Sequence, residues 1–166
     1  KNFDFYVNDA FSVSHRNHAS VLAITKFLPS YAGFLMEKEI NNLDKVLNEP
    51  ANGKTIVLGG AKISTKLPVI KNFLDKTDHI LIGGALANTI FKARGVKIGQ
   101  SVTEEVKEQI DWDNPKIVLP KDFIVSEDQS GKTFPEIISV KDLGENKMIL
   151  DIGPETIKEF SKIIND

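Results

Sequence analysis

The stretch that decides the fold is Thr55-Ile56-Val57-Leu58-Gly59-Gly60-Ala61-Lys62-Ile63-Ser64-Thr65-Lys66. Its first four residues form a continuous apolar run, which predicts a short β-strand buried on both faces. The two glycines that follow allow a tight turn, and Ser64 is a suitable N-cap for a helix that continues to about residue 76. Pro68 then falls in the first turn of that helix, where a missing N–H is tolerated.

The same succession of strand, glycine turn and helix occurs twice more. Residues 79–82 predict a strand that ends at Gly83-Gly84, followed by a helix over 85–93 that Gly95 closes. Residues 147–152 predict a strand that runs into Gly153, with Pro154 at the start of the last helix. Three such units predict an α/β fold with a doubly wound parallel sheet, Rossmann-like and three-layered. Ligands of such sheets bind at the carboxyl ends of the strands, where we expect all three glycine turns.

The remaining segments predict further strands and helices, and they suggest an incomplete sheet. Strands are expected at residues 3–8, 116–119 and 122–125. Helices are expected over 32–48, ended by Pro50, and from Thr103 onward, with Glu105 and Glu108 near its exposed side. Because the first pattern is already a strand and the last is still a helix, we expect the chain to be a fragment of a longer protein.

The composition is that of an ordinary globular protein. Of 166 residues, 41% are apolar and 27% are charged, which suits one domain or one domain with part of another. The net charge of -2 gives no basic excess for nucleic acid or an anionic membrane. The chain has no cysteine, which excludes disulfides and cysteine metal sites, and no apolar run of membrane-spanning length. We therefore expect a cytoplasmic protein with no nucleic acid and no membrane among its partners.

The first glycine turn carries a candidate anion site. Lys62 and Lys66 are four residues apart and would share a face if both were helical, beside the positive end of the following helix. The alternative is a plain tight turn with two solvated lysines. The small residues at 83–85 leave room for a flat ring, although close helix–strand packing explains them as well. Residues 151–156 either line the same cleft or simply connect a strand to a helix that begins with proline.

The loop before residue 20 carries a second candidate. Arg16 can clamp a phosphate or carboxylate through two hydrogen bonds, and His15 and His18 add donors, whereas the alternative is a solvated polar loop. The two histidines have no third ligand nearby, so a metal site is not expected. Two Gly-Lys-Thr tripeptides, at 53–55 and 131–133, lack the earlier glycine of a Walker loop, and no G-x-G-x-x-G occurs.

Five motifs in this order and spacing resemble those of phosphoglycerate kinases. They are Val7-Asn8-Asp9-Ala10-Phe11 with His15-Arg16, Ala32-Gly33-Phe34-Leu35-Met36-Glu37-Lys38-Glu39, Gly59-Gly60-Ala61-Lys62, Ile82-Gly83-Gly84, and Leu150-Asp151-Ile152-Gly153-Pro154-Glu155-Thr156. The resemblance implies that residues 1–31 are the remnant of an N-terminal phosphoglycerate-binding domain. It implies that 32–49 are the interdomain helix and 50–166 the first half of a C-terminal nucleotide-binding domain.

The resemblance also implies roles for individual residues. Arg16 matches the arginine that holds phosphoglycerate, and His15 belongs to the same basic patch. Lys66 matches a lysine on the nucleotide phosphates, and Lys62 lies close to the transferred phosphate. The turns around the nucleotide are implied to be Gly59, Gly60, Gly83 and Gly84. Departures from the family pattern are Ser12, Ser14 and Ala85, and residues 128–147 match it weakly.

The implied reaction is the glycolytic transfer of a phosphoryl group from 1,3-bisphosphoglycerate to ADP, which gives 3-phosphoglycerate and ATP. Mg²⁺ would be carried with the nucleotide, with no metal ligand identified in this chain, and the family implies a monomer. The activity would belong to the full-length chain, so we expect these residues alone to be nearly inactive and prone to self-association. The alternative is a standalone nucleotide- or phosphate-binding α/β module without catalysis.

Overall fold

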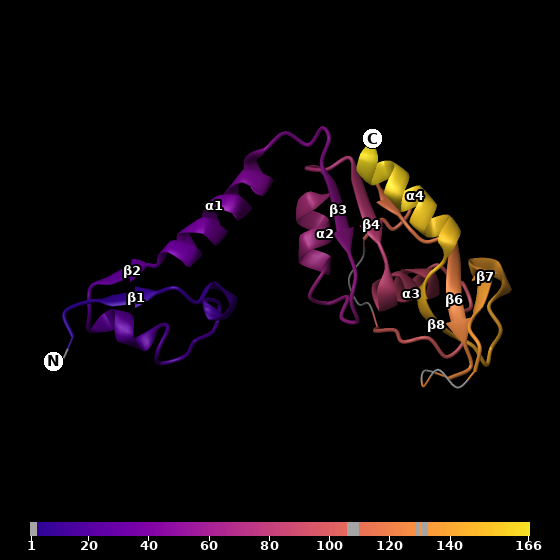
Figure 1. Cartoon of the computed structure of the whole chain (residues 1–166), viewed down its shortest axis with the longest axis horizontal. Coiled ribbons are helices and arrows are strands. Elements are labelled where there is room, and N and C mark those ends of the chain that lie inside the picture. Colours follow the sequence, from indigo (N-terminus) through magenta and orange to yellow (C-terminus); the bar gives the residue numbers. More distant parts are fainter. Residues whose placement is uncertain (1–2, 106–109, 129, 131–132) are drawn as a thin grey trace. The chain divides into compact units, whose positions relative to one another are not determined.

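The computed structural model describes residues 3–105, 110–128, 130 and 133–166 of the chain. It divides into two compact units, Lys1–Glu49 and Pro50–Asp166 (Figure 1). Among the described residues, no helix is both long and apolar enough to cross a lipid bilayer.

The first unit contains a small parallel sheet and one long helix. Strand β1 (Tyr6–Asn8) pairs in parallel with β2 (Ser30–Ala32), and two 3-10 helices, η1 (Phe11–Val13) and η2 (Ala23–Lys26), lie between them in sequence. Helix α1 (Phe34–Asn48) follows, as the apolar stripe predicts. The predicted strand over 3–8 is shorter than expected, because β2 offers only three partner residues.

The second unit begins with the predicted parallel strands. Strand β3 (Thr55–Leu58), helix α2 (Leu67–Phe73), strand β4 (His79–Ile82), helix α3 (Gly84–Ala93) and strand β5 (Ile117–Val118) form a three-stranded parallel sheet in the order β3-β4-β5. Gly95 closes α3 with a φ of +77°, as predicted. This part of the fold agrees with an incomplete Rossmann-like sheet.

A second sheet follows, and it corrects one prediction. Strands β7 (Glu136–Ser139), β6 (Asp122–Ser126) and β8 (Met148–Ile152) pair antiparallel in the order β7-β6-β8, and helix α4 (Pro154–Asn165) comes last. A short 3-10 helix, η3 (Val140–Asp142), precedes β8. The prediction that residues 147–152 form a third strand of the parallel sheet is wrong. The apolar pattern identifies the strand, but its partner is β6, which lies more than 20 residues earlier.

Two further expectations need correction. Strand β3 is not buried on both faces, because Val57, on one of its faces, is 62% exposed. The expected helix from Thr103 is not formed over 103–105, and its continuation, with Glu108, lies outside the described residues.

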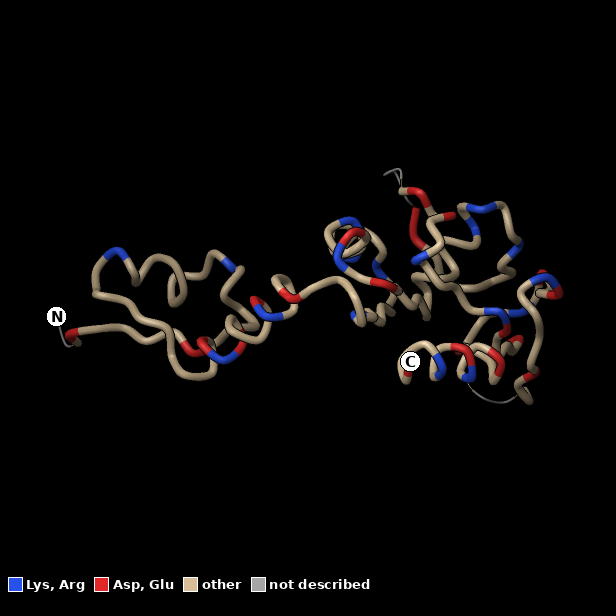
Figure 2. Tube along the Cα trace, turned by 90° about the horizontal axis from the view of Figure 1, so that it is seen from above, with Lys and Arg blue, Asp and Glu red and all other residues tan. Residues whose placement is uncertain are grey.

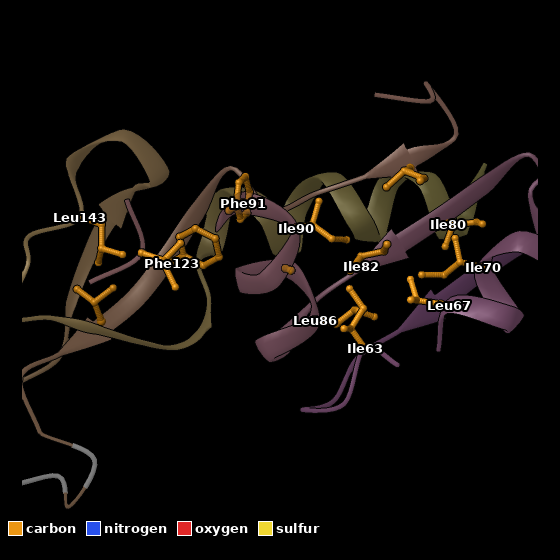
Figure 3. Close-up of a cluster of buried hydrophobic side chains, with 14 residues drawn as sticks. Ile63, Leu67, Ile70, Ile80, Ile82, Leu86, Ile90, Phe91, Phe123 and Leu143 are labelled. Atoms are coloured by element: carbon orange, nitrogen blue, oxygen red, sulfur yellow. The ribbon is translucent and has the colours of Figure 1, made fainter. Parts of the chain in front are cut away.

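One apolar core joins both sheets of the second unit (Figure 3). Ile80 and Ile82 of β4 are fully buried, and Leu86 of α3 packs close to Ile63 from the turn after β3. Further along the core, Phe91 of α3 meets Phe123 of β6 edge to face, with ring centroids 5.6 Å apart. Because α3 contacts both sheets, the turn that begins α3 is held in a fixed place.

Charge is spread over the surface in both signs. Figure 2 shows acidic and basic segments alternating along the C-terminal helix and along much of the rest of the trace. This distribution agrees with the small net charge and places any anion-binding role on local groups.

Candidate functional site

Two glycine turns meet at the carboxyl edge of the parallel sheet. Leu58 and Ile82 are partners in register, so β3 and β4 end side by side. The Gly83 N–H donates to the Leu58 carbonyl (2.9 Å), and the Leu86 N–H donates to the Gly60 carbonyl (3.0 Å). The first two predicted turns therefore lie together at one edge.

The conformation of these turns requires glycine. Gly60 has a φ of +118° and Gly84 a φ of +62°, in the range that L-residues with a Cβ rarely adopt. A Cβ on Gly84 would also lie 3.2 Å from the Gly60 nitrogen. Both the backbone geometry and the close approach exclude side chains where the turns touch.

A pocket of about 410 Å³ opens beside the second turn. Its walls come from Gly84, Ala85 and Asn88 of α3, Val102, Phe123 of β6, and residues 149–152 of β8. Small residues of α3 line part of this pocket and mainly apolar side chains line the rest, which is the usual lining of a small-molecule site. Asn88 is 2% exposed and donates through Nδ2 to the Val102 carbonyl (3.3 Å), which holds the pocket wall against α3.

The third glycine turn takes part in a different way. Ile152, at the end of β8, reaches within 3.8 Å of the place where a Cβ on Gly83 would be, so β8 does arrive at this edge. Gly153 itself faces the carboxylate of Asp122, which accepts hydrogen bonds from the N–H groups of Glu155 (3.0 Å) and Thr156 (2.8 Å). Strand β8 therefore lines the pocket, while the carboxylate of Asp122 caps α4 beside the turn.

The lysine turn, residues 61–66, connects the first glycine turn to α2. Lys62 is exposed and Lys66 is half-buried, and Lys66 is the residue that precedes the helix. The sequence predicted Ser64 as the N-cap of this helix, but Lys66 occupies that position. The two lysines therefore do not share a helical face. Pro68 does fall in the first turn of α2, as predicted.

Ser64 is instead bound by an acidic side chain that the sequence did not point to. The carboxylate of Glu104 accepts hydrogen bonds from Ser64 N (3.0 Å) and Ser64 Oγ (2.9 Å). The bond from the Ser64 backbone, then that from its side chain, lowers the pKa of Glu104, and the positive charge of Lys62 adds a smaller effect in the same direction. Glu104 is therefore a stable anion beside the lysine turn.

Asp122 is a second carboxylate that sequence reasoning missed, and unlike Glu104 it is buried. Burial alone would raise its pKa, but hydrogen bonds from Thr156 Oγ1 and from the Glu155 and Thr156 N–H groups outweigh burial, so the pKa is lowered. The bonds to Glu104 and Asp122 span 40 and more than 30 residues, and no local pattern signals them.

The first unit has its own polar pocket, of about 320 Å³. His15 and Arg16 both line it, together with Asn8, Ser14, Asn17, Val21 and Leu22, whereas His18 is not among its walls. The turn that carries these residues is closed by bonds from Arg16 N to the Val13 carbonyl (2.9 Å) and from Ser14 Oγ to the Phe11 carbonyl (2.7 Å). The two predicted substrate residues therefore share one concave surface.

No group of three His, Cys, Asp or Glu side chains that could hold a metal occurs within the described residues.

Comparison with known proteins gives a consistent result over the whole chain. A sequence model described as "Phosphoglycerate kinase" matches residues 1–166. Curated relatives of that name include one from Coprothermobacter proteolyticus, 47% identical over 97% of this chain, and one from Finegoldia magna, 44% identical over 97%. A solved phosphoglycerate kinase from Coxiella burnetii matches 96% of the chain with a TM-score of 0.80 and 32% identity. The chain spans 42% to 43% of the length of these proteins, and the predicted family and fold class are confirmed.

Proposed function

The chain belongs to the phosphoglycerate kinase family, and from this premise we propose that the full-length protein transfers a phosphoryl group between 1,3-bisphosphoglycerate and ADP. The products in this direction are 3-phosphoglycerate and ATP. The observation that carries the proposal is the contact between the two glycine turns, with Lys62 and Lys66 on the segment that leaves the first turn.

The nucleotide would lie across both turns. Its base would occupy the 410 Å³ pocket, where Gly84 and Ala85 present no bulky side chain to a ring. Its phosphates would extend from there toward Gly59, Gly60 and the lysine turn. Backbone close to glycine can approach a phosphate without steric hindrance, and the two ammonium groups supply the opposite charge.

The two lysines would have separate tasks. Lys66, half-buried at the start of α2, would hold a nucleotide phosphate in place, and its limited freedom suits that task. Lys62, exposed on the turn, can follow the phosphoryl group as it moves between the substrates. Neutralising charge at the transferred group is the main requirement of phosphoryl transfer, since little covalent chemistry is asked of the protein.

The phosphoglycerate would bind in the pocket of the first unit. The Arg16 guanidinium can bind a phosphate or carboxylate through two parallel hydrogen bonds, and His15 lines the same wall. We propose accordingly that residues 1–31 belong to a phosphoglycerate domain, 32–49 to an interdomain helix and 50–166 to a nucleotide domain. Closure of the two domains would exclude water from the transferred group.

The reaction itself is an exchange of one P–O bond for another. A terminal oxygen of the ADP β-phosphate forms the new bond to phosphorus, and the bond from phosphorus to the acyl oxygen breaks, leaving the 3-phosphoglycerate carboxylate. Mg²⁺ is part of the nucleotide substrate and shares the neutralisation of the phosphate charge with the lysines. The protein's contribution is orientation and charge.

The decisive experiment measures phosphoryl transfer by the full-length protein, with ADP and 1,3-bisphosphoglycerate in one direction and ATP and 3-phosphoglycerate in the other. Transfer that depends on both substrates is expected. Lys158→Ala, on the exposed side of α4, is a matched lysine control that should not change the rate. A folded full-length protein that binds nucleotide but transfers no phosphoryl group in either direction would refute the proposal.

A further inference from the structure

Glu104 connects the lysine turn to the helix that follows the second glycine turn. On one side, its two carboxylate oxygens each accept a bond from Ser64, one from the backbone N–H (3.0 Å) and one from the hydroxyl (2.9 Å). On the other side, its own N–H donates to Thr89 Oγ1 of α3 (3.1 Å). One residue therefore ties together two elements that are 25 residues apart in the chain.

The α3 side of this connection is rigid. Thr89 is 2% exposed, and its hydroxyl also donates to the Ala85 carbonyl (2.9 Å). Two residues before Glu104, the Val102 carbonyl accepts a bond from the buried Asn88 amide. Ser101, also buried, accepts a bond from Ile149 N of β8 (2.9 Å). The segment 101–104 is thus fixed to the core before it reaches the lysine turn.

The lysine turn is otherwise held by one buried side chain and by bonds within the turn itself, namely Thr65 Oγ1 to the Lys62 carbonyl (3.0 Å) and Lys66 N to the Ile63 carbonyl (2.8 Å), as far as the described residues show. Ile63 is fully buried and packs near Leu86 in the core (Figure 3). Ala61, Lys62 and Thr65 are exposed on either side of it. These contacts are local to the turn, whereas the paired bonds from Ser64 to Glu104 fix its backbone to a segment 40 residues away.

We propose that Glu104 is a positioning residue for nucleotide binding: it fixes the backbone of the lysine turn so that Lys62 and Lys66 are directed at the phosphates. This inference rests on the proposed function of the same site. Glu104 does not touch the nucleotide and acts through Ser64, with both of its carboxylate oxygens already engaged by that residue.

The sign of the effect separates positioning from simple electrostatics. Glu104 is an anion close to Lys62, so an effect of charge alone would make its removal tighten the binding of a phosphate. Positioning makes the opposite prediction, because loss of the bonds to Ser64 lets the turn rotate and moves the ammonium groups. A purely structural role would lower stability and leave the affinity of the folded protein unchanged.

The test compares Glu104→Ala and Glu104→Gln in the full-length protein, with ADP and 3-phosphoglycerate titrated separately by calorimetry. We expect Glu104→Ala to raise the Kd for ADP about tenfold, the factor that corresponds to partial loss of one hydrogen bond to a charged group. Glu104→Gln keeps one acceptor for Ser64, so its Kd for ADP should lie between those of the wild type and Glu104→Ala. Glu105→Ala removes the neighbouring exposed charge and should bind ADP as the wild type does, and the Kd for 3-phosphoglycerate should stay constant throughout.

The possible outcomes separate this inference from the proposed function. An unchanged or lower Kd for ADP in both Glu104 variants overturns the positioning role. If Glu104→Ala does not fold, Glu104→Gln decides by the same criterion. A wild-type protein that binds ADP but transfers no phosphoryl group refutes the proposed reaction, while the Kd values still judge Glu104. A wild-type protein that does not bind ADP overturns both.

Discussion

The contact between the two glycine turns can be perturbed with a single methyl group, in the variant Gly84→Ala. Gly84 has a φ of +62°, so alanine there should cost about 1–2 kcal/mol of folding free energy. The added Cβ would also lie 3.2 Å from the Gly60 nitrogen, inside the optimal separation of about 3.5 Å for non-bonded atoms. To restore that optimal separation, the two turns must move apart by about 0.3 Å.

Gly95→Ala is the matched control for this variant. Gly95 has a similar φ of +77° at the other end of α3, and a Cβ there would meet nothing within 4 Å. Both variants should lose about 1–2 kcal/mol of unfolding free energy, because both place alanine in the left-handed region. Only Gly84→Ala should also move the nucleotide site.

The assay is steady-state kinetics of the full-length protein, with the unfolding free energy of each variant measured by urea denaturation. The KM for ADP should rise about three- to tenfold in Gly84→Ala, because a shift of about 0.3 Å weakens hydrogen bonds to the charged phosphates without removing them. In Gly95→Ala it should equal that of the wild type. Equal KM values for ADP in the two variants would refute the argument that contact between the turns shapes the nucleotide site.

Three further predictions concern single side chains. Lys66→Ala should lower kcat/KM for ADP by about 10²-fold, the usual effect of removing one preorganised donor, and leave the circular dichroism spectrum unchanged. Unaltered kinetics would contradict the proposed role of Lys66. Arg16→Lys should raise the KM for 3-phosphoglycerate about tenfold, since the forked pair of bonds is lost, and leave the KM for ATP alone. Asp122→Asn should cost about 2 kcal/mol of unfolding free energy at pH 7, from weakened bonds to Glu155 and Thr156. Because the pKa of Asp122 is lowered in the folded state, this difference should be complete above its unfolded pKa of about 4 and shrink as the pH falls through the folded value, as urea denaturation at several pH values would show.

The sequence predicted those elements whose signals are local. Each of three signals lies within a short stretch of sequence: the apolar stripe of α1, the apolar run of β4 and the glycine that closes α3. All three predictions are confirmed. The first two glycine turns also lie where parallel strands of equal register place them. Family membership, predicted from five short motifs, is confirmed over residues 1–166.

The predictions that failed depend on contacts between distant segments. An apolar run identifies β8 as a strand but cannot say that its partner is β6 in an antiparallel sheet. A serine before a helix is a normal N-cap signal, yet Ser64 is bound by a carboxylate 40 residues later. In both cases the local pattern allows two structures, and a tertiary hydrogen bond decides between them.

A tertiary contact also distinguishes the third glycine turn from the first two, although all three have similar sequences. Helix α4 begins after Gly153, and the Asp122 carboxylate already accepts its first N–H groups. A side chain on Gly153 would collide with that carboxylate, just as one on Gly33 would collide with Asp9, which accepts a bond from Met36 N at the start of α1. A helix start that holds an internal anion repels an external phosphate.

Helix α3 begins without such an anion. Within the described residues, no side chain caps its first turn, and the residue before it, Gly83, is in contact with the first glycine turn instead. The positive end of α3 therefore lies beside the first glycine turn, in agreement with the proposed phosphate site, whereas the positive end of α4 is neutralised by Asp122. The sequence pattern of strand, glycine and helix is common to all three turns, and the carboxylate of Asp122 distinguishes the third turn from the two that we propose to bind the nucleotide.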